Sequence, residues 1–159
     1  PRLHFCLSSM APLIAKSKKD TYNPEVQQLT AECFEPQNMF VKILDFDAEE
    51  DKYMAISVGY RGDVKMKEGN AAVNWLKANK KVSFVEWCPT GFKVGYNACP
   101  AAVTEEDDVA EMTRTIQMIG NNTAISRVVS EQITKKYDVM YSQRAFVHWY
   151  VGEGMEEGE

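Results

Sequence analysis

The chain has 159 residues, with 18 basic and 23 acidic side chains and a formal net charge of −5 at pH 7. Hydrophobic residues make up 45% and charged residues 26%, which is typical of a folded globular domain and excludes a wholly disordered chain. The sequence contains no basic stripe with interleaved aromatic residues, so it does not indicate nucleic-acid binding. No apolar run approaches the ~20 residues that cross a bilayer, and residues 1–9 do not resemble a signal peptide, so we expect a soluble cytosolic protein.

Cysteines and histidines are few and widely spaced. They are Cys6, Cys33, Cys88, Cys99, His4 and His148. Their spacing follows neither a disulfide framework nor a zinc site. We therefore expect no metal site, and reduced, mostly buried thiols in a reducing compartment.

The first predicted elements are a strand, a loop and a helix. Apolar and polar residues alternate over 2–8, the pattern of a half-buried strand, and a loop over 9–23 with three lysines follows. Residues 23–25 (Asn-Pro-Glu) indicate a helix start, with a capping residue, a proline in the first turn and an acid at the positive end of the helix dipole. The helix should end before Pro36.

The middle of the chain predicts a turn, a strand and a second helix. The acidic stretch 45–51 indicates a solvated turn. Residues 53–61 alternate as a strand, which places Tyr53 on one face and Tyr60 on the other. A helix is predicted over 65–79.

Further strands are predicted over 82–86, 92–96 and 113–119, and a loop from 97 to about 109 contains four consecutive acids. A last helix, capped at 121–123, carries apolar residues at helical spacing as far as Met140. A short aromatic segment then leads into an acidic end. The order of elements predicts an α+β fold of the layered kind, with a mixed β-sheet flanked by helices.

No constellation for catalysis is visible. The chain has neither a phosphate-binding glycine loop nor a nucleophile elbow. His148 lies among aromatic residues and is expected to be packed and hydrogen-bonded rather than a catalytic base, and Cys88 lacks a nearby histidine.

Two segments have a composition that suggests more than a structural role. Residues 87–93 combine tryptophan, proline and glycine between two strands, and residues 146–159 run from an aromatic cluster into four glutamates. From the residues alone, the first is either an ordinary turn or a surface that faces a partner. The second is either a solvated loop or a binding surface, since aromatic anchors beside charge are typical of binding hot spots.

The same two segments resemble a known family. Residues 84–95 (FVEWCPTGFKVG) resemble the α-tubulin stretch FVDWCPTGFKVG, and residues 144–159 (RAFVHWYVGEGMEEGE) match the tubulin pattern throughout. Shorter matches occur in order along the chain at 1–5, 33–36, 60–64, 70–72 and 122–125. The sequence is therefore identified as a member of the tubulin family, most like the α type.

Some segments depart from the α pattern. PRLHF at 1–5 and the triplet 119–121 look β-like, and the acidic stretch 45–51 replaces a shorter turn of the family. The lysines of 16–19 lie in the loop that tubulins use for lateral contacts, so lateral packing is expected to differ here.

The resemblance implies a domain organisation. Residues 1–120 correspond to the intermediate domain, and residues 121–159 to the start of the C-terminal helical region. GTP and Mg²⁺ would be bound by a domain that precedes these residues, and the parent protein resembles a GTPase. No catalytic, cofactor-binding or metal-binding residue is carried over to this chain. Both ends look like cuts through a longer protein.

The resemblance also implies partner surfaces. The interface residues are Pro89, Thr90, Gly91, Phe92, Lys93, Trp149, Tyr150, Val151 and Gly152. The residues that would face microtubule motors are Glu156, Glu157 and Glu159. The expected function is that of an α-tubulin-like structural subunit of cytoplasmic microtubules, which pairs with β-tubulin and assembles head to tail. The alternative is a free-standing truncated paralogue that binds motors or assembly factors.

Overall fold

The structure is a computed structural model that describes residues 4–89 and 91–158. These residues fall into two compact units, one within Pro1–Ala124 and the other within Ile125–Glu159. The first unit contains the β-sheet with its helices, and the second is helical. Each unit is described by itself.

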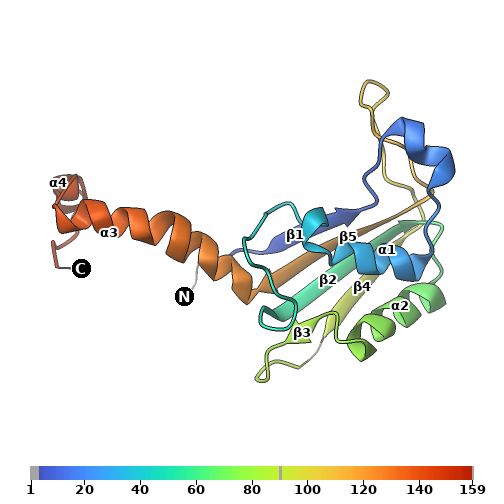
Figure 1. The fold of residues 1–159 in the computed structure, drawn as a ribbon, viewed down its shortest axis with the longest axis horizontal. Helices are drawn as coiled ribbons and strands as arrows, with labels where there is room; N and C mark the ends of the chain where they lie inside the picture. The colour runs from blue at the N-terminus through green and yellow to red at the C-terminus, as the bar shows by residue number, and fades with distance from the viewer. Residues whose placement is uncertain (1–3, 90, 159) are drawn as a thin grey trace. The chain divides into compact units, whose positions relative to one another are not determined.

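The first unit is built on a five-stranded mixed sheet (Figure 1). Its strands are β1 (Leu7–Ala11), β2 (Lys52–Gly62), β3 (Ser83–Phe84), β4 (Phe92–Asn97) and β5 (Arg114–Asn122). β5 pairs antiparallel with β1 on one side and with β2 on the other. The far side of β2 pairs in parallel first with β3 and then with β4. The predicted mixed sheet is confirmed.

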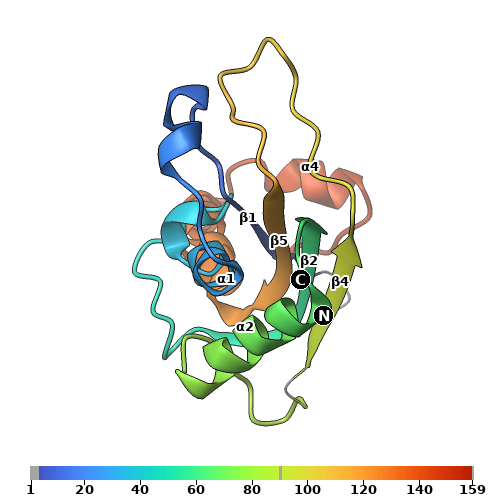
Figure 2. The ribbon, with the colours of Figure 1, turned by 90° about the vertical axis from the view of Figure 1, so that its right-hand side faces the viewer.

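Two helices cover one face of this sheet. They are α1 (Val26–Cys33) and α2 (Met66–Ala78), and both lie on the same side of the strands (Figure 2). The short segments η1 (Lys16–Thr21) and η2 (Pro36–Asn38) complete the unit, and η3 (Thr123–Ile125) spans the boundary between the two units. Each long helix has apolar residues at helical spacing, as expected for an element with one buried face. Leu29 and Leu76 are fully buried between helices and sheet.

The second unit begins with a π-helical segment, η4 (Val128–Thr134), that runs into α3 (Lys135–Ser142). A short helix, α4 (Val147–Gly152), follows. The predicted apolar stripe along η4 and α3 is present, but its side chains are exposed, with Ile133 57% and Met140 45% accessible. Among the described residues of this unit only Val147 is buried, so the unit has almost no core of its own.

The alternation predicted for β2 is wrong at one position. Tyr53 and Tyr60 were expected on opposite faces, but both are buried, with accessibilities of 3% and 1%. The register against β5 shifts between Tyr53 and Ala55, and such a β-bulge inserts one residue and reverses the alternation beyond it. The bulge therefore brings both tyrosines into the same core.

Other boundaries differ from the sequence prediction. β1 occupies 7–11 rather than 2–8, because its hydrogen-bonding partner is residues 116–120 of β5, and its residues 8–10 lack the branched side chains that mark a strand. Residues 2 and 3 lie outside the described part. α1 begins at Val26, and its N-cap residue is Glu25, which forms no side-chain cap hydrogen bond, rather than the predicted Asn23. The strand predicted over 82–86 shortens to β3, which pairs only with residues 52–53.

Buried hydrogen bonds connect α1 to the sheet. The Ser9 hydroxyl of β1 donates to the Cys33 carbonyl oxygen at 2.6 Å and lies 3.1 Å from the Cys33 sulfur. The Thr30 and Tyr60 hydroxyl oxygens are 2.8 Å apart, and Thr30 also donates to the Val26 carbonyl oxygen. Buried polar groups are costly unless bonded, so these bonds allow polar side chains in the layer between helix and sheet.

Two of these groups have raised pKa values. Burial raises the pKa of the Cys33 thiol from 9.0 to about 11, and the Ser9 hydrogen bond only partly offsets this. Burial likewise raises the pKa of the Tyr60 hydroxyl from 10.0 to about 12. Contrary to the prediction of mostly buried thiols, only Cys33 is buried; Cys6 and Cys99 are exposed, and Cys88 is half-buried.

Two glycines meet close neighbours. Gly62 ends β2 with a φ of +90°, and a Cβ there would lie 2.0 Å from the Thr113 carbonyl oxygen. A Cβ on Gly120 would lie 2.8 Å from the Tyr53 ring. Both positions therefore require glycine, the first for its backbone conformation and the second for space.

We expect Gly120→Ala to lower the free energy of unfolding by about 1–3 kcal/mol, because the added methyl group must displace a buried tyrosine. Gly59→Ala is the matched control, since nothing lies within 4 Å of the Cβ it would add. The control should leave stability unchanged or raise it by up to about 1 kcal/mol. Urea unfolding measures both; equal effects would contradict the close approach of Tyr53.

The free energy of unfolding should fall as the pH rises from about 9 towards 11, because the folded chain retains the Cys33 proton that the unfolded chain releases. This contribution is complete below pH 9.0 and is lost as the pH approaches the folded-state value. Between pH 9 and 10, Cys33→Ala should flatten the slope, whereas Cys99→Ala should not. Urea unfolding at several pH values measures the slopes, and an unchanged slope in Cys33→Ala would contradict the prediction.

Candidate partner-binding surfaces

The first predicted surface is the turn between β3 and β4. Its base is held by two contacts with β2: Val85 N–H donates to the Tyr53 carbonyl oxygen, and the Cys88 thiol to that of Met54, each at 3.1 Å. Pro89 and Gly91 are exposed, and Thr90 lies outside the described residues. The turn is therefore anchored at its base, while Pro89 and Gly91 face solvent.

Phe92 and Lys93 continue this surface onto β4. The Phe92 ring lies edge-on to Phe84 at 5.5 Å and to Phe34 at 5.9 Å between ring centres, so it is half-buried and fixed. Lys93 is exposed. Trp87 is 74% exposed, the most exposed large apolar side chain that the structure describes. Trp87 belongs to the segment 87–93 but is not among the predicted interface residues, which begin at Pro89. Its position just before a Cys-Pro turn could have indicated its exposure.

The second predicted surface is α4. Its four predicted interface residues are consecutive and all exposed: Trp149 is 67%, Tyr150 45% and Val151 47% accessible, and Gly152 is also exposed. α4 begins after Phe146, whose φ of 60° is left-handed. His148 is exposed and lies against Trp149 at 5.0 Å between rings, so the expectation of a packed histidine was wrong.

Aromatic contacts within the second unit hold α4 against α3. Tyr137 stacks on Tyr141 at 5.8 Å between ring centres and meets Tyr150 edge-on at 6.3 Å. Beside these rings is a hollow of about 280 Å³ that Phe146 and Val147 also line. Such rigid aromatic groups lose little conformational freedom when a partner covers them.

The acidic segment after α4 is partly neutralised. The Arg144 guanidinium lies 3.3 Å from the Glu157 carboxylate, and the Tyr141 hydroxyl donates to the Glu157 carbonyl oxygen. Glu156 is exposed, and Glu159 lies outside the described residues. Of the three predicted acidic contacts, the structure thus describes Glu156 as a solvent-facing carboxylate and Glu157 as one in an ion pair.

The sequence did not predict a third surface, which is formed by the loop 98–113 together with residues 14–16. The loop 98–113 lies against residues 14–16, where Ala110 N–H donates to the Ile14 carbonyl oxygen at 2.9 Å. The Lys16 backbone N–H donates to Asp108 at 3.3 Å, and its ammonium group to the Glu105 carbonyl oxygen at 2.8 Å. The opposite charges of 16–19 and 105–108 were visible in the sequence, but nothing there indicated that the two segments meet.

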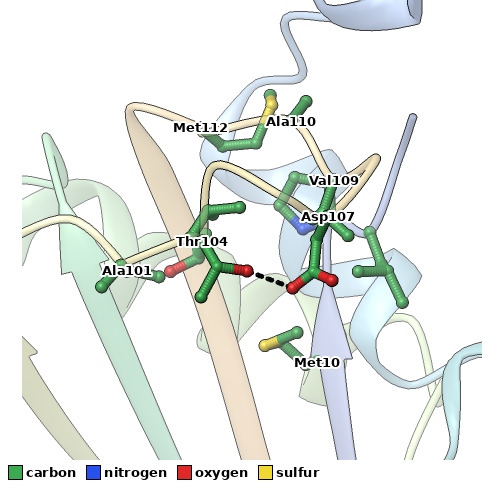
Figure 3. A pocket seen from close by; sticks show the side chains of 12 residues that line it. Met10, Ala101, Thr104, Asp107, Val109, Ala110 and Met112 are labelled. Carbon is green, nitrogen blue, oxygen red and sulfur yellow. Dashed lines mark hydrogen bonds between the residues drawn. The ribbon is translucent and has the colours of Figure 1, made fainter. Parts of the chain in front are cut away.

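A hollow of about 240 Å³ lies under this loop (Figure 3). Its wall is mostly apolar, with Met10, Val109 and Met112 among its side chains. The Thr104 hydroxyl donates to the Asp107 carboxylate at this hollow. The hollow therefore suits a small apolar group better than a charged substrate.

None of these surfaces has the arrangement of a catalytic or metal centre. In residues 4–89 and 91–158, no three His, Cys, Asp or Glu side chains come together as a metal site. The half-buried Cys88 thiol is bonded to a backbone carbonyl oxygen, with no histidine within two residues of it in sequence. Over the same residues, every helix is too short or too polar to span a bilayer.

Comparisons with known proteins identify what the chain resembles. The sequence model of the family described as "Tubulin C-terminal domain" matches residues 1–134. The chain is 51% identical over all 159 residues to the tubulin alpha-1 chain of Arabidopsis thaliana. It is 49% identical over the same length to the nucleomorph tubulin alpha chain of Guillardia theta. It spans 34% and 35% of these relatives, about a third of their length.

The contact between Lys16 and Asp108 should protect the lysine-rich segment from limited proteolysis. In Asp108→Ala, trypsin should cut after the lysines of residues 16–19 about two- to fivefold faster, because one exposed hydrogen bond contributes about 0.5–1 kcal/mol to holding the segment. Glu106→Ala is the control, since no contact of its side chain holds 14–19. Mass spectrometry of the early fragments measures the rates; equal rates in both variants would contradict the role of Asp108.

Proposed function

Because this chain belongs to the tubulin family, we propose that it is part of an α-type structural subunit of microtubules that pairs with β-tubulin and assembles head to tail. The observation that carries the proposal is the 51% identity to an α chain, which extends over all 159 residues. Under this proposal the protein acts in the cytoplasmic cytoskeleton.

The pairing surface in this proposal is α4. Trp149 and Tyr150 present large aromatic side chains to solvent on one short helix, and the Tyr137 contact holds that helix in place. Burying such rigid aromatic groups yields much apolar contact for a small loss of entropy, which is why they dominate binding hot spots. Val151 and Gly152 continue the surface to the end of α4.

The stacking surface in this proposal is the turn at 89–93. Its exposed tip and fixed base would let a neighbouring subunit pack against a preformed shape, which lowers the entropic cost of association. Phe92 anchors the turn, and the adjacent Trp87 adds exposed apolar area.

The domain roles follow the same family relationship. We propose residues 1–120 as the intermediate domain and 121–159 as the start of the C-terminal helical region, with Glu156, Glu157 and Glu159 facing motors. GTP and Mg²⁺ binding is proposed for the whole protein. The described residues of this chain do not fit these groups, because they contain neither a cluster of metal-binding side chains nor a glycine-rich phosphate loop. No step of nucleotide hydrolysis is assigned to them.

The pairing surface can be tested by co-purification of the tagged chain with β-tubulin. The unsubstituted chain should retain β-tubulin, and Trp149→Ala should weaken retention by about tenfold or more, as expected for an aromatic hot spot. Trp149 is 67% exposed, so its truncation should leave the fold intact.

Phe40→Ala is the matched control, because Phe40 is also an exposed aromatic residue, at 60%, but lies outside the proposed interface. The control should bind like the unsubstituted chain. If β-tubulin does not co-purify, the pairing proposal fails; if both variants bind equally well, α4 is not the pairing surface.

A further inference from the structure

The two edges of the sheet differ in how they are covered. At the β1 edge, Met39 forms a bridge with Ser9, and Phe40 N–H donates to the Ser8 carbonyl oxygen at 3.0 Å. β4 is the outermost strand on the other side and pairs with β2 alone (Figure 1). Among the described residues, no backbone group bonds to its outer edge. An open edge of six residues is a template for an added strand.

A polar stripe of α2 runs beside this edge. Lys67, Asn70, Asn74 and Lys77 are spaced by three, four and three residues, so they lie along one side of the helix, and all four are exposed. The Tyr96 hydroxyl lies 3.0 Å from the Asn70 side-chain oxygen, and the Lys77 ammonium lies 5.1 Å from the centre of the Phe92 ring. These contacts place the stripe along β4 from its last residues to its first.

The charge at this edge is opposite to that of the whole chain. Residues 65–97 carry six lysines and two glutamates, although the chain has a net charge of −5. All six lysines are exposed, and none forms an ion pair with another described residue. Lys93 projects from β4 on the face opposite to Phe92 and Tyr96, because side chains alternate along a strand. Lysines thus flank the open edge on both faces of the sheet.

We propose that the outer edge of β4 binds an extended acidic peptide segment of another protein, which adds a strand to the sheet. The backbone of the segment pairs with β4, while its carboxylates face Lys93 on one side and the α2 stripe on the other. Specificity for acidic segments comes from this charge complementarity, and the backbone bonds contribute affinity.

A second copy of the chain is a poorer partner for this edge than an acidic segment. Antiparallel pairing of β4 with its own copy that places Lys93 opposite Lys93 or Gly95 brings the two ammonium groups together on one face, and like charges on adjacent strands are destabilising. A lysine on an edge strand also discourages aggregation with neutral strands. Lys93, which disfavours a second copy and neutral strands, favours an acidic strand at this edge. Phe92 and Lys93 also belong to the proposed stacking surface, but the inference does not depend on that assembly, because it is tested on the unassembled chain.

Fluorescence anisotropy with the full chain tests the proposal, using an eight-residue peptide of two Glu-Glu-Val-Val repeats, whose carboxylates lie on both faces of an extended strand. This peptide should bind, with an affinity that falls as salt is raised. A matched peptide with lysine in place of each glutamate should not bind. A third peptide, with glutamate retained but every backbone nitrogen methylated, should bind at least tenfold more weakly, since neither of its edges can donate the strand hydrogen bonds.

Charge-reversing variants locate the site on the protein. Lys93→Glu and Lys77→Glu should each weaken the glutamate peptide about tenfold, whereas Lys18→Glu, the same change on a lysine far from β4 in sequence, should weaken it much less. Binding should also slow hydrogen exchange of the backbone amides in 92–97. Absence of binding, equal binding of the methylated peptide, or equal loss in all three variants would each overturn the proposal.

Discussion

Strand β2 forms hydrogen bonds along both of its sides, so it is the central strand that positions the other strands of the first unit. Residues 53–62 pair with β5 on one side, with Met54 left out at the bulge, while β3 and β4 divide the other side between them. The bulge between Tyr53 and Ala55 is the constraint within this strand, because it turns Tyr53 towards the same core as Tyr60. Without it, one of the two tyrosines would face solvent.

The two tyrosines set how closely other elements approach. Gly120 leaves room for the Tyr53 ring, and Gly69 of α2 lies over Tyr60 and the Tyr96 ring that stacks on it at 5.5 Å. α1 is held instead by hydroxyl bonds, through Thr30 to Tyr60 and through Ser9 to Cys33. These bonds are directional, so they fix the position of the helix over the sheet more narrowly than apolar contact alone.

The candidate surfaces lie where this framework ends. The turn at 86–91 leaves the sheet beside the first residues of β2, and the loop 98–113 connects β4 to β5 and lies over residues 14–16. In the second unit the aromatic contacts of Tyr137 orient α4. In each case a fixed base carries exposed side chains, the arrangement by which loops on a rigid scaffold bind partners.

The sequence by itself determined the kinds of element, their order and the mixed sheet. The sequence pattern identified the bounds of β2, α2 and β4 to within one or two residues, although the bulge reverses the alternation within β2. The composition of 146–159 also indicated a surface segment, and Trp149, Tyr150 and Glu156 within it are exposed.

Only the tertiary structure decided which segments meet. The position of β1, the bulge in β2 and the contact of Lys16 with Asp108 all depend on partners far away in the chain, and local patterns do not contain that information. The free outer edge of β4 is likewise a property of the assembled sheet, because whether a strand is central or at an edge depends on which other strands pair with it.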